Sequence, residues 1–332
     1  MHSPSRTTLK HAVEVSGVGL FTGAPATLRL SPFTNPAIEA TCGDGAMFVR
    51  SCTGYRFVFR RTDTGAAPWC VAGPDVISRT PIHPAFREMP PRCTSLDLRV
   101  SGHDSAEQPI ATVGTVEHIL SALVGMGITD ALIEVDGPEV PILDGSSLAF
   151  AALIHQSGTQ TLDDEIQPIV VREPVVIERN DTRIEVQPSN TYSLTYSLDY
   201  GASSPIRNGV CSWVNDDADS IESDTAVVAT GRDGYASLVA PARTFCLKAE
   251  ADQMQRAGFF KHLTTRDMLV IDGDGPIDTT YRHPQECALH KLLDLIGDLA
   301  LAGAPILGHI AASRTGHAAN HAMAIAVAEQ RK

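Results

Sequence analysis

Ionisable side chains recur every four residues in the segment HKLLDLIGDLAL, at His290, Asp294 and Asp298. Four residues make slightly more than one helical turn, so the three side chains line one face of a helix. The residues between them are mostly apolar, which indicates that this helix is largely buried. A buried imidazole and two buried carboxylates are costly unless a cation or hydrogen-bond partners compensate them. The spacing therefore indicates either a metal site with His290 and Asp294 as ligands, or an ordinary ion pair or satisfied polar pair.

A second cluster lies far upstream, in the segment GTVEHILSAL. Glu117 and His118 stand at the start of an apolar pattern that predicts a buried helix over residues 115–126. His118 would complete a set of two histidines and one aspartate and leave one coordination position open for water. An open position distinguishes catalytic zinc sites from structural ones. The two segments together favour a catalytic metal site.

The composition narrows the class of protein. A formal charge of −13 over 332 residues, with no basic stripe, argues against nucleic acid as the main partner. Seven cysteines without a C-x-x-C motif favour reduced thiols in a cytoplasm over a disulfide framework. No run of apolar residues is long enough to span a membrane, and the N-terminus has no apolar core typical of a signal peptide. We expect a cytoplasmic protein.

The apolar patterns predict an α+β fold of two similar domains, residues 1–160 and 166–332. Each domain is expected to be a small β-sheet packed with a helix pair, with the active site between the domains. Residues 38–70 are expected to be irregular apart from one strand, and the polar residues 158–168 to be a linker. The predicted strands are within 6–36 and at 55–60, 131–135, 169–178, 182–187, 191–199, 267–272 and 305–312, and the predicted helices are 115–126, 146–156 with Ser146 as cap, 284–302 and 317–330.

Five segments in fixed order resemble a known enzyme family. TVEHILSAL, EVPILDGSS, ARTF, HKLLDLIGDLAL and SRTGHAANH are similar to segments of UDP-3-O-acyl-N-acetylglucosamine deacetylase, the zinc enzyme that commits the cell to lipid A synthesis. The resemblance covers nearly the whole chain. It implies a zinc-dependent amidohydrolase that removes the N-acetyl group of UDP-3-O-(3-hydroxyacyl)-N-acetylglucosamine and releases acetate. The implied ligand is a small UDP-linked, acylated amino sugar, and the implied oligomeric state is a monomer.

The resemblance also implies which residues hold the metal and move the first proton. His118, His290 and Asp294 match the family's zinc ligands. Ferrous iron is the alternative metal, because the ligand set contains none of the cysteines that would favour zinc. Glu117 matches the general base that takes a proton from the attacking water.

Further residues match the family's acid and its substrate contacts. His317 matches the histidine that stabilises developing charge and protonates the leaving amine, and Asp298 matches the residue that orients this imidazole. The remaining matches are Thr244 as a hydroxyl aimed at the oxyanion with Phe245 as its neighbouring substrate contact, Lys291 as a substrate-contacting cation, Arg314 near the nucleotide phosphates, and Asp144 as a carboxylate that orients the site.

The sequence departs from the family's pattern at several places around the expected pocket. Phe21 stands where the family has a histidine, Cys246 and Leu247 replace a Gly-Phe pair, and residues 262–264 (His-Leu-Thr) replace a glycine-rich turn. We expect residues 251–260, together with this turn, to form the wall of an apolar slot for the acyl chain. The metal ligands, base and acid are all present, so we expect an active zinc amidase with altered substrate recognition.

Two other functions remain open from the sequence. One is deacetylation of a different N-acetylated sugar nucleotide. The other is a non-catalytic paralogue that binds the nucleotide sugar or the acyl chain, which would be free to lose Glu117. The other histidines have no partner at ligand spacing, so we expect them to be structural or on the surface; they include His83, His103, His262, His309 and His321.

Overall fold

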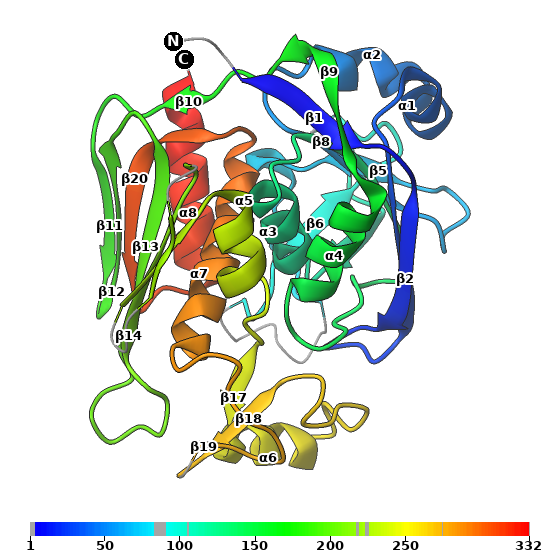
Figure 1. The fold of residues 1–332 in the computed structure, drawn as a ribbon. Helices are drawn as coiled ribbons and strands as arrows, with labels where there is room; N and C mark the ends of the chain where they lie inside the picture. The colour runs from blue at the N-terminus through cyan, green and yellow to red at the C-terminus, as the bar shows by residue number, and fades with distance from the viewer. Residues whose placement is uncertain are drawn as a thin grey trace.

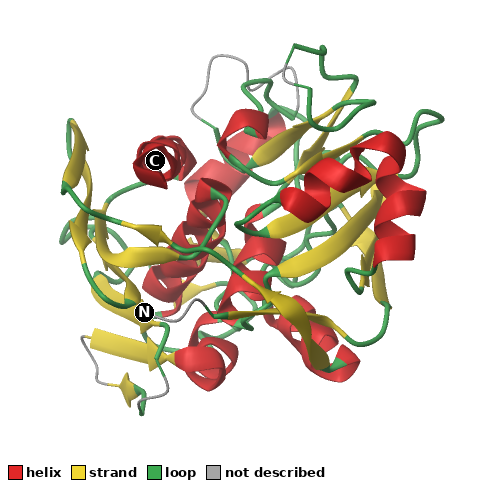
Figure 2. Ribbon diagram, turned by 90° about the horizontal axis from the view of Figure 1, so that it is seen from above, coloured by secondary structure: helices red, strands yellow, loops and turns green. Residues whose placement is uncertain are grey.

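The computed structural model describes residues 4–82, 91–104, 106–216, 219–222, 226–273 and 275–331. Two large β-sheets form outer layers, and the long helices lie between them (Figure 1). Figure 2 shows the same helices, in red, seen from above. The first sheet uses residues before 166 and the second uses residues after 168. The predicted α+β class is confirmed.

The first sheet has the strand order β2-β3-β8-β1-β9, with β4 and β5 joined through β8. Alternation explains its inner face: Leu28 and Leu30 are fully buried, whereas Arg29 between them is exposed. A separate pair, β6 and β7, lies beside it. The strands are β1 (Ser5–Leu9), β2 (Val13–Val18), β3 (Pro25–Ser31), β4 (Arg56–Arg61), β5 (Trp69–Val71), β6 (Ser95–Leu98), β7 (Ala111–Gly114), β8 (Asp130–Asp136) and β9 (Thr159–Glu165).

The second sheet has the strand order β11-β12-β20-β13-β14-β16-β15, with β10 beside β20. A small unit of three strands and one helix projects from the end of the molecule (Figure 1). The strands of the second sheet are β10 (Ile169–Val170), β11 (Val175–Arg179), β12 (Thr182–Pro188), β13 (Tyr192–Leu198), β14 (Gly209–Val214), β15 (Ile221–Glu222), β16 (Ala226–Thr230) and β20 (Ile306–Ser313), and those of the small unit are β17 (Phe245–Leu247), β18 (Leu269–Asp272) and β19 (Gly275–Pro276).

The helices between the sheets are packed in pairs, and α3 lies directly against α7. Every residue of α7 except Lys291 is buried, as its apolar pattern predicts. The α-helices are α1 (Asn35–Cys42), α2 (Ala46–Ser51), α3 (Glu117–Gly125), α4 (Leu148–Ser157), α5 (Gly231–Gly234), α6 (Lys248–Arg256), α7 (Glu286–Leu299) and α8 (His317–Ala328). Short 3₁₀ or π segments are Gly43–Gly45, Pro74–Val76, Tyr235–Val239, Ala300–Ala302 and Glu329–Arg331.

One hydrophobic core runs through both halves of the chain. A single cluster of contacting buried side chains extends from Leu9 in β1 to Val327 in α8. The two expected halves therefore share a core through the contact of α3 with α7, and the division at residues 1–160 and 166–332 stays a prediction. None of the helices in the described ranges combines the length and apolarity that crossing a membrane requires.

Three local predictions were wrong. The region expected to be irregular contains α1 and α2; Thr34 caps α1 by accepting a hydrogen bond from the backbone of Ala37, and Pro36 opens the helix. The polar stretch expected to be a linker forms β9, an edge strand whose exposed outer side tolerates polar residues. Helix α4 begins at Leu148 with Ser147 as its N-cap, one residue after the predicted cap; the Ser146 hydroxyl donates to Asp144 and accepts from the backbone N–H of Leu148.

Candidate active site

Helices α3 and α7 bring the two clusters predicted from the sequence together. Gly297 of α7 lies against the start of α3, where an added Cβ would stand 2.0 Å from the carbonyl oxygen of Glu117. The missing side chain lets the two backbones approach closely. This contact places Glu117 and His118 opposite His290 and Asp294.

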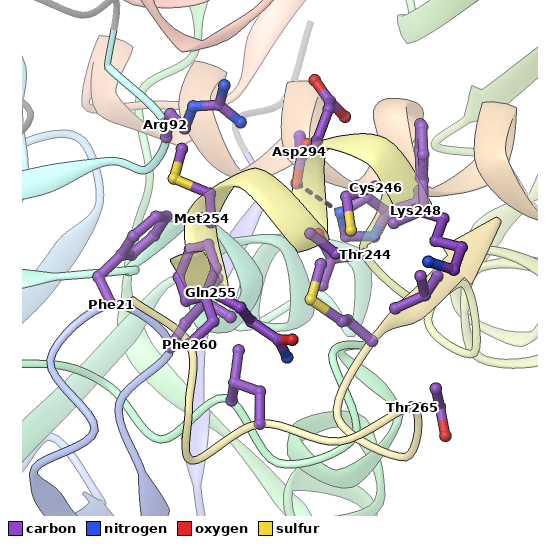
Figure 3. A pocket seen from close by; sticks show the side chains of 18 of the residues that line it. Phe21, Arg92, Thr244, Cys246, Lys248, Met254, Gln255, Phe260, Thr265 and Asp294 are labelled. Atoms are coloured by element: carbon purple, nitrogen blue, oxygen red, sulfur yellow. Dashed lines mark ion pairs between the residues drawn. The ribbon is translucent and has the colours of Figure 1, made fainter. Parts of the chain in front are cut away.

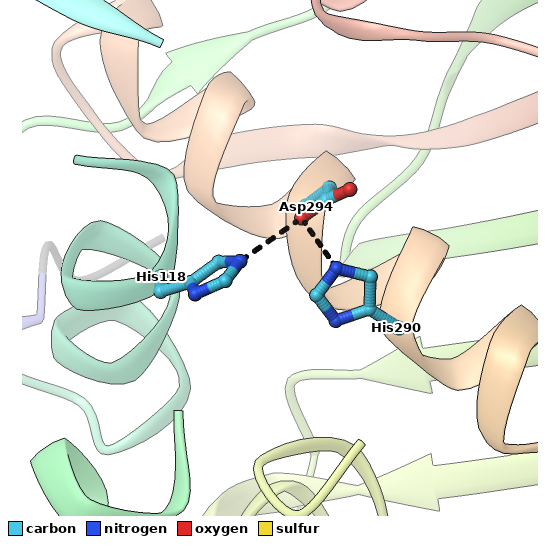
Figure 4. A group of neighbouring side chains, drawn as sticks. All are labelled: His118, His290 and Asp294. Atoms are coloured by element: carbon cyan, nitrogen blue, oxygen red, sulfur yellow. Dashed lines mark ion pairs between the residues drawn. The ribbon is translucent and has the colours of Figure 1, made fainter. Parts of the chain in front are cut away.

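Three side chains form a compact donor set (Figure 4). Nε2 of His118 and Nε2 of His290 both face Oδ1 of Asp294, at 3.6 and 3.4 Å. All three residues are buried. Both distances exceed those of a hydrogen bond, and Asp294 Oδ1 has no hydrogen-bond partner within the described part of the chain. A cation between the three atoms would compensate this orphaned oxygen, so the donor set fits a metal ion.

Contacts outside the donor set fix its orientation. His290 Nδ1 donates to the carbonyl oxygen of Ala242 at 3.1 Å, which turns the lone pair of Nε2 toward Asp294. Burial lowers the pKa of His290 to about 3, so this imidazole is neutral, as a metal ligand must be. Lys291 Nζ donates to Asp294 Oδ2 at 2.6 Å. Burial opposes ionisation of Asp294, but nearby positive charge, including the ammonium of Lys291, holds its pKa well below the usual value.

Glu117 and His317 face each other beside the donor set. His317 Nε2 lies 3.9 Å from Glu117 Oε1, and the backbone N–H of Thr94 donates to Glu117 Oε2 at 3.0 Å. Burial raises the pKa of Glu117 above the usual value for a glutamate. A carboxylate with a raised pKa is a stronger base, which suits a group that must take a proton near neutral pH.

Asp298 holds His317 from behind. His317 Nδ1 donates to Asp298 Oδ2 at 2.9 Å, and Asn320 Nδ2 donates to the same oxygen at 2.8 Å. The Thr94 hydroxyl donates to Asp298 Oδ1 at 2.5 Å. Although burial lowers the pKa of His317, Asp298 raises it to about 9. His317 is therefore protonated at neutral pH and can act as an acid.

His321 belongs to this group as well. Its Nε2 lies 2.8 Å from the Thr94 hydroxyl and 3.6 Å from Asp298 Oδ1. We expected His321 to have no partner at ligand spacing, which was wrong, because it lies four residues after His317 on one face of α8. His262 is structural, since its Nε2 donates to the carbonyl oxygen of Gly19. His83 lies outside the described residues.

A cavity of 450 Å³ opens onto these groups. Figure 3 shows the side chains around it, with Asp294 and Thr244 at its inner part and Phe21, Met254 and Phe260 along one wall. Arg92 and Lys248 also line the cavity, so cationic and apolar walls belong to the same space.

The apolar wall is built from two distant segments. Phe21 is buried, and its ring centre lies 5.6 Å from that of Phe260. Met254 and Leu263 pack against the same small cluster. Residues 251–260 and 262–264, expected as the wall of a slot, do contribute to this cavity.

Thr244, Phe245 and Lys291 line the cavity as expected. The backbone N–H of Thr244 donates to the carbonyl oxygen of Gly145 at 2.7 Å, and its own carbonyl oxygen accepts from Leu269 at 2.8 Å. These two bonds hold Thr244 between the LDGSS turn and β18.

Three predicted site residues lie outside the cavity lining: Asp298, which sits behind His317, and Asp144 and Arg314. Asp144 accepts hydrogen bonds from Ser146 and from Arg282, so its carboxylate stabilises the LDGSS turn behind Thr244. Arg314 is partly exposed and ion-paired with Asp199 and Asp181. It does not line the cavity, and its predicted contact with the nucleotide phosphates stays a prediction.

Sequence reasoning missed Thr94, Asn320 and Arg92. Asn320 lies three residues after His317 on α8, and this spacing could have identified it. Thr94 and Arg92 lie before a short strand, 23 or more residues away from Glu117 in the sequence, and no periodic pattern marks them.

Comparisons with known proteins agree with this geometry. A family model described as LpxC, UDP-3-O-acyl N-acetylglycosamine deacetylase, matches residues 6–329. A protein of Anaeromyxobacter dehalogenans named UDP-3-O-acyl-N-acetylglucosamine deacetylase is 32% identical over 324 residues, which cover 97% of this chain and 87% of that protein. Proteins with the same name from Solibacter usitatus (32% identical, covering 96% of this chain and 89% of that protein) and Leptospira biflexa (29% identical, 98% and 90%) are also similar. With one family model spanning nearly its whole length, the chain belongs to the UDP-3-O-acyl N-acetylglycosamine deacetylase family.

Proposed function

We propose that this protein hydrolyses the N-acetyl group of UDP-3-O-(3-hydroxyacyl)-N-acetylglucosamine and releases acetate, the committed step of lipid A biosynthesis. Membership in the deacetylase family supports this reaction. The single observation that carries it is the orphaned Oδ1 of Asp294, which lies between two buried imidazoles and next to a paired base and acid. This arrangement suits metal-assisted hydrolysis of an amide, which needs an activated water and a protonated leaving group.

His118, His290 and Asp294 would hold the metal, and we propose zinc with ferrous iron as the alternative. When bound, such an ion polarises the substrate carbonyl and lowers the pKa of water. The seven cysteines are all free and none belongs to the donor set, which supports a reducing, cytoplasmic location. A monomer is the accompanying proposal.

Different side chains around the metal ligands carry out the separate proton transfers. Glu117 takes the proton of the attacking water, helped by its raised pKa. The hydroxyl of Thr244 donates to the developing oxyanion, and the protonated ring of His317 adds positive charge. His317 then gives its proton to the departing amine, while Asp298 keeps the ring oriented throughout.

The cavity suits a substrate that carries both a charged and an apolar part. The apolar wall of Phe21, Met254, Phe260 and Leu263 would take the acyl chain. The cationic side chains on the cavity wall would take the nucleotide, and among them we propose Arg92 as the main phosphate contact in place of Arg314.

The test is acetate release from the UDP-linked substrate by protein whose metal content has been measured. We expect turnover that requires the metal and that Glu117→Gln lowers by ~10²- to 10⁴-fold, the usual contribution of general base catalysis, with metal binding retained. The matched control is Glu39→Gln, which removes an exposed carboxylate that pairs with Arg50 and should leave turnover unchanged.

Two results would favour the competing functions. Acetate release from another N-acetylated sugar nucleotide, but not from this one, would reassign the substrate. Tight binding of the substrate with no acetate release, in the wild type and in Glu117→Gln alike, would identify a binding protein.

A further inference from the structure

One buried threonine contacts both halves of the proton-transfer machinery. The side chain of Thr94 is fully buried, immediately before β6, and belongs to none of the helices that carry the site. Its backbone N–H donates to Glu117 Oε2 at 3.0 Å. Its hydroxyl lies 2.5 Å from Asp298 Oδ1 and 2.8 Å from His321 Nε2.

The number of protons determines the direction of each of these bonds. A threonine hydroxyl has one proton to donate, and an ionised carboxylate can only accept. Thr94 therefore donates its proton to Asp298 and accepts from His321, which must carry a proton on Nε2. The other oxygen of Asp298 accepts from His317 and Asn320. Both carboxylate oxygens are thus satisfied, which leaves Asp298 one stable orientation.

The geometry points to Thr94 as a positioning residue that fixes the general base, Glu117, relative to the acid, His317. We propose that it holds Glu117 through its backbone and Asp298 through its hydroxyl, and through Asp298 also the ring of His317. The base comes from α3 and the acid from α8, and Thr94 bonds to the base and to the carboxylate behind the acid. This inference rests on the deacetylation proposed above.

The first experiment is Thr94→Val, which removes the hydroxyl, keeps the backbone N–H and has nearly the same shape. We expect kcat for acetate release to fall about 10- to 100-fold, the factor that a hydrogen bond to a charged group is worth. KM and metal content should stay unchanged, and Thr94→Ser should restore most of the activity. The matched control is Thr8→Val, which removes an equally buried hydroxyl that accepts from the backbone of Phe33 and should leave kcat unchanged.

A double-mutant cycle separates positioning from simple packing. If Thr94 acts through the acid pair, Thr94→Val should cost much less in a His317→Gln protein than in the wild type. The same fold loss in both backgrounds, or a loss of metal on Thr94→Val, would overturn the proposal.

A measurement on the wild type keeps the two proposals distinct. Nitrogen-15 NMR of the histidine rings should find His321 protonated on Nε2, and this proton should be protected from exchange with water. A proton on Nδ1 instead would contradict the bond directions and overturn the role of Thr94, whether or not the protein is active. A protonated Nε2 in a protein that releases no acetate would leave the hydrogen bonds of Thr94 supported and refute the proposed reaction, and with it the role of Thr94 in that reaction.

Discussion

Two aspartates one helical turn apart on α7, Asp294 and Asp298, each belong to a separate group of imidazoles, and the two groups differ in how their carboxylates are satisfied. Asp294 has an oxygen without a hydrogen-bond partner in the described ranges, and two imidazole nitrogens face this oxygen beyond hydrogen-bond distance. Asp298 has both oxygens occupied, by Thr94 on one side and by His317 and Asn320 on the other. The first carboxylate needs a cation, and the second does not.

Proximity alone does not separate the two groups. The possible ligand atoms of Asp298, His317 and His321 lie as close together as those of the donor set around Asp294, within 4.8 Å. The two groups differ in the number of hydrogen bonds that the surrounding protein donates to each carboxylate. A carboxylate that accepts protein hydrogen bonds on both oxygens keeps its imidazole charged and oriented for proton transfer, whereas one with an open oxygen can serve a metal ion.

The largest effect should follow from removing a ligand. His290→Ala takes away one of the two imidazoles that face Asp294, so the protein should lose most of its metal. Turnover should fall by ~10³-fold or more, because the metal contributes several kcal/mol to the reaction. Metal analysis of the purified variant together with an acetate assay checks this. His103→Ala, at an exposed histidine stacked on Phe48, should change neither quantity.

Removing the acid, His317, should distinguish the functions of the two groups, because turnover should be lost while the metal is retained. His317→Gln should lower kcat by ~10²- to 10⁴-fold, the usual contribution of a general acid. Metal content should equal that of the wild type, and a loss of metal would show that both groups bind ions. His309→Gln is the control, because His309 contacts Ser193 on the second sheet, away from the cavity.

A smaller change should follow from Asp298→Asn, and it should depend on pH. His317 acts as an acid only when protonated, so activity should fall as the pH rises through about 9. Removing the negative charge of Asp298 lowers the pKa of His317, so the decline of activity on the basic side of the pH profile (its basic limb) moves to lower pH. We expect kcat at pH 8 to fall about 10- to 100-fold, and a pH profile of kcat in both proteins tests it. An unmoved basic limb would show that the Asp298 charge does not support His317.

The ion pair of His317 and Asp298 also makes the free energy of unfolding depend on pH. The pKa of His317 is raised on folding from about 6.5 to about 9, so its charged contact with Asp298 stabilises the fold fully below about pH 6.5. That contribution is lost as the pH rises through about 9. Denaturant unfolding of the wild type across this range should therefore show a decline in the free energy of unfolding that is absent from Asp298→Asn.

The smallest effect on catalysis should come from the apolar wall, which contacts neither carboxylate. Phe260→Ala removes the ring that faces Phe21 and should leave metal content and kcat nearly unchanged. It should shift kcat/KM toward longer acyl chains, by about fourfold for each added methylene that is buried. Competition between substrates of two chain lengths measures this, with the exposed Phe48→Ala as control. An unaltered preference would mean that the acyl chain binds elsewhere.

The metal donor set could be predicted from the sequence because each half of it is local. His290 and Asp294 share a helical face, and Glu117 and His118 open a helix with a strong apolar pattern. The contact between the two helices depends on Gly297, whose role is visible only once the backbones are placed. Periodicity could not show that the two helices form one site; the resemblance to a known family indicated it.

Other parts of the site could not be predicted because they depend on tertiary contacts. Thr94 is far from its partners in the sequence, and only the packing of β6 beside the helices brings it to Asp298. The motif gives the position of Arg314 along the chain but not the two carboxylates that pair with it, so its predicted phosphate contact stays a prediction. Strand β9 was taken for a linker because an edge strand can be as polar as a loop.

The most direct test of the division between the two groups is the metal content of three proteins: the wild type, Asp294→Asn and Asp298→Asn. The structure predicts about one equivalent of metal in the wild type and in Asp298→Asn, and very little in Asp294→Asn. Two equivalents in the wild type, or an equal loss of metal in both variants, would contradict the assignment of Asp294 to the metal and of Asp298 to proton transfer.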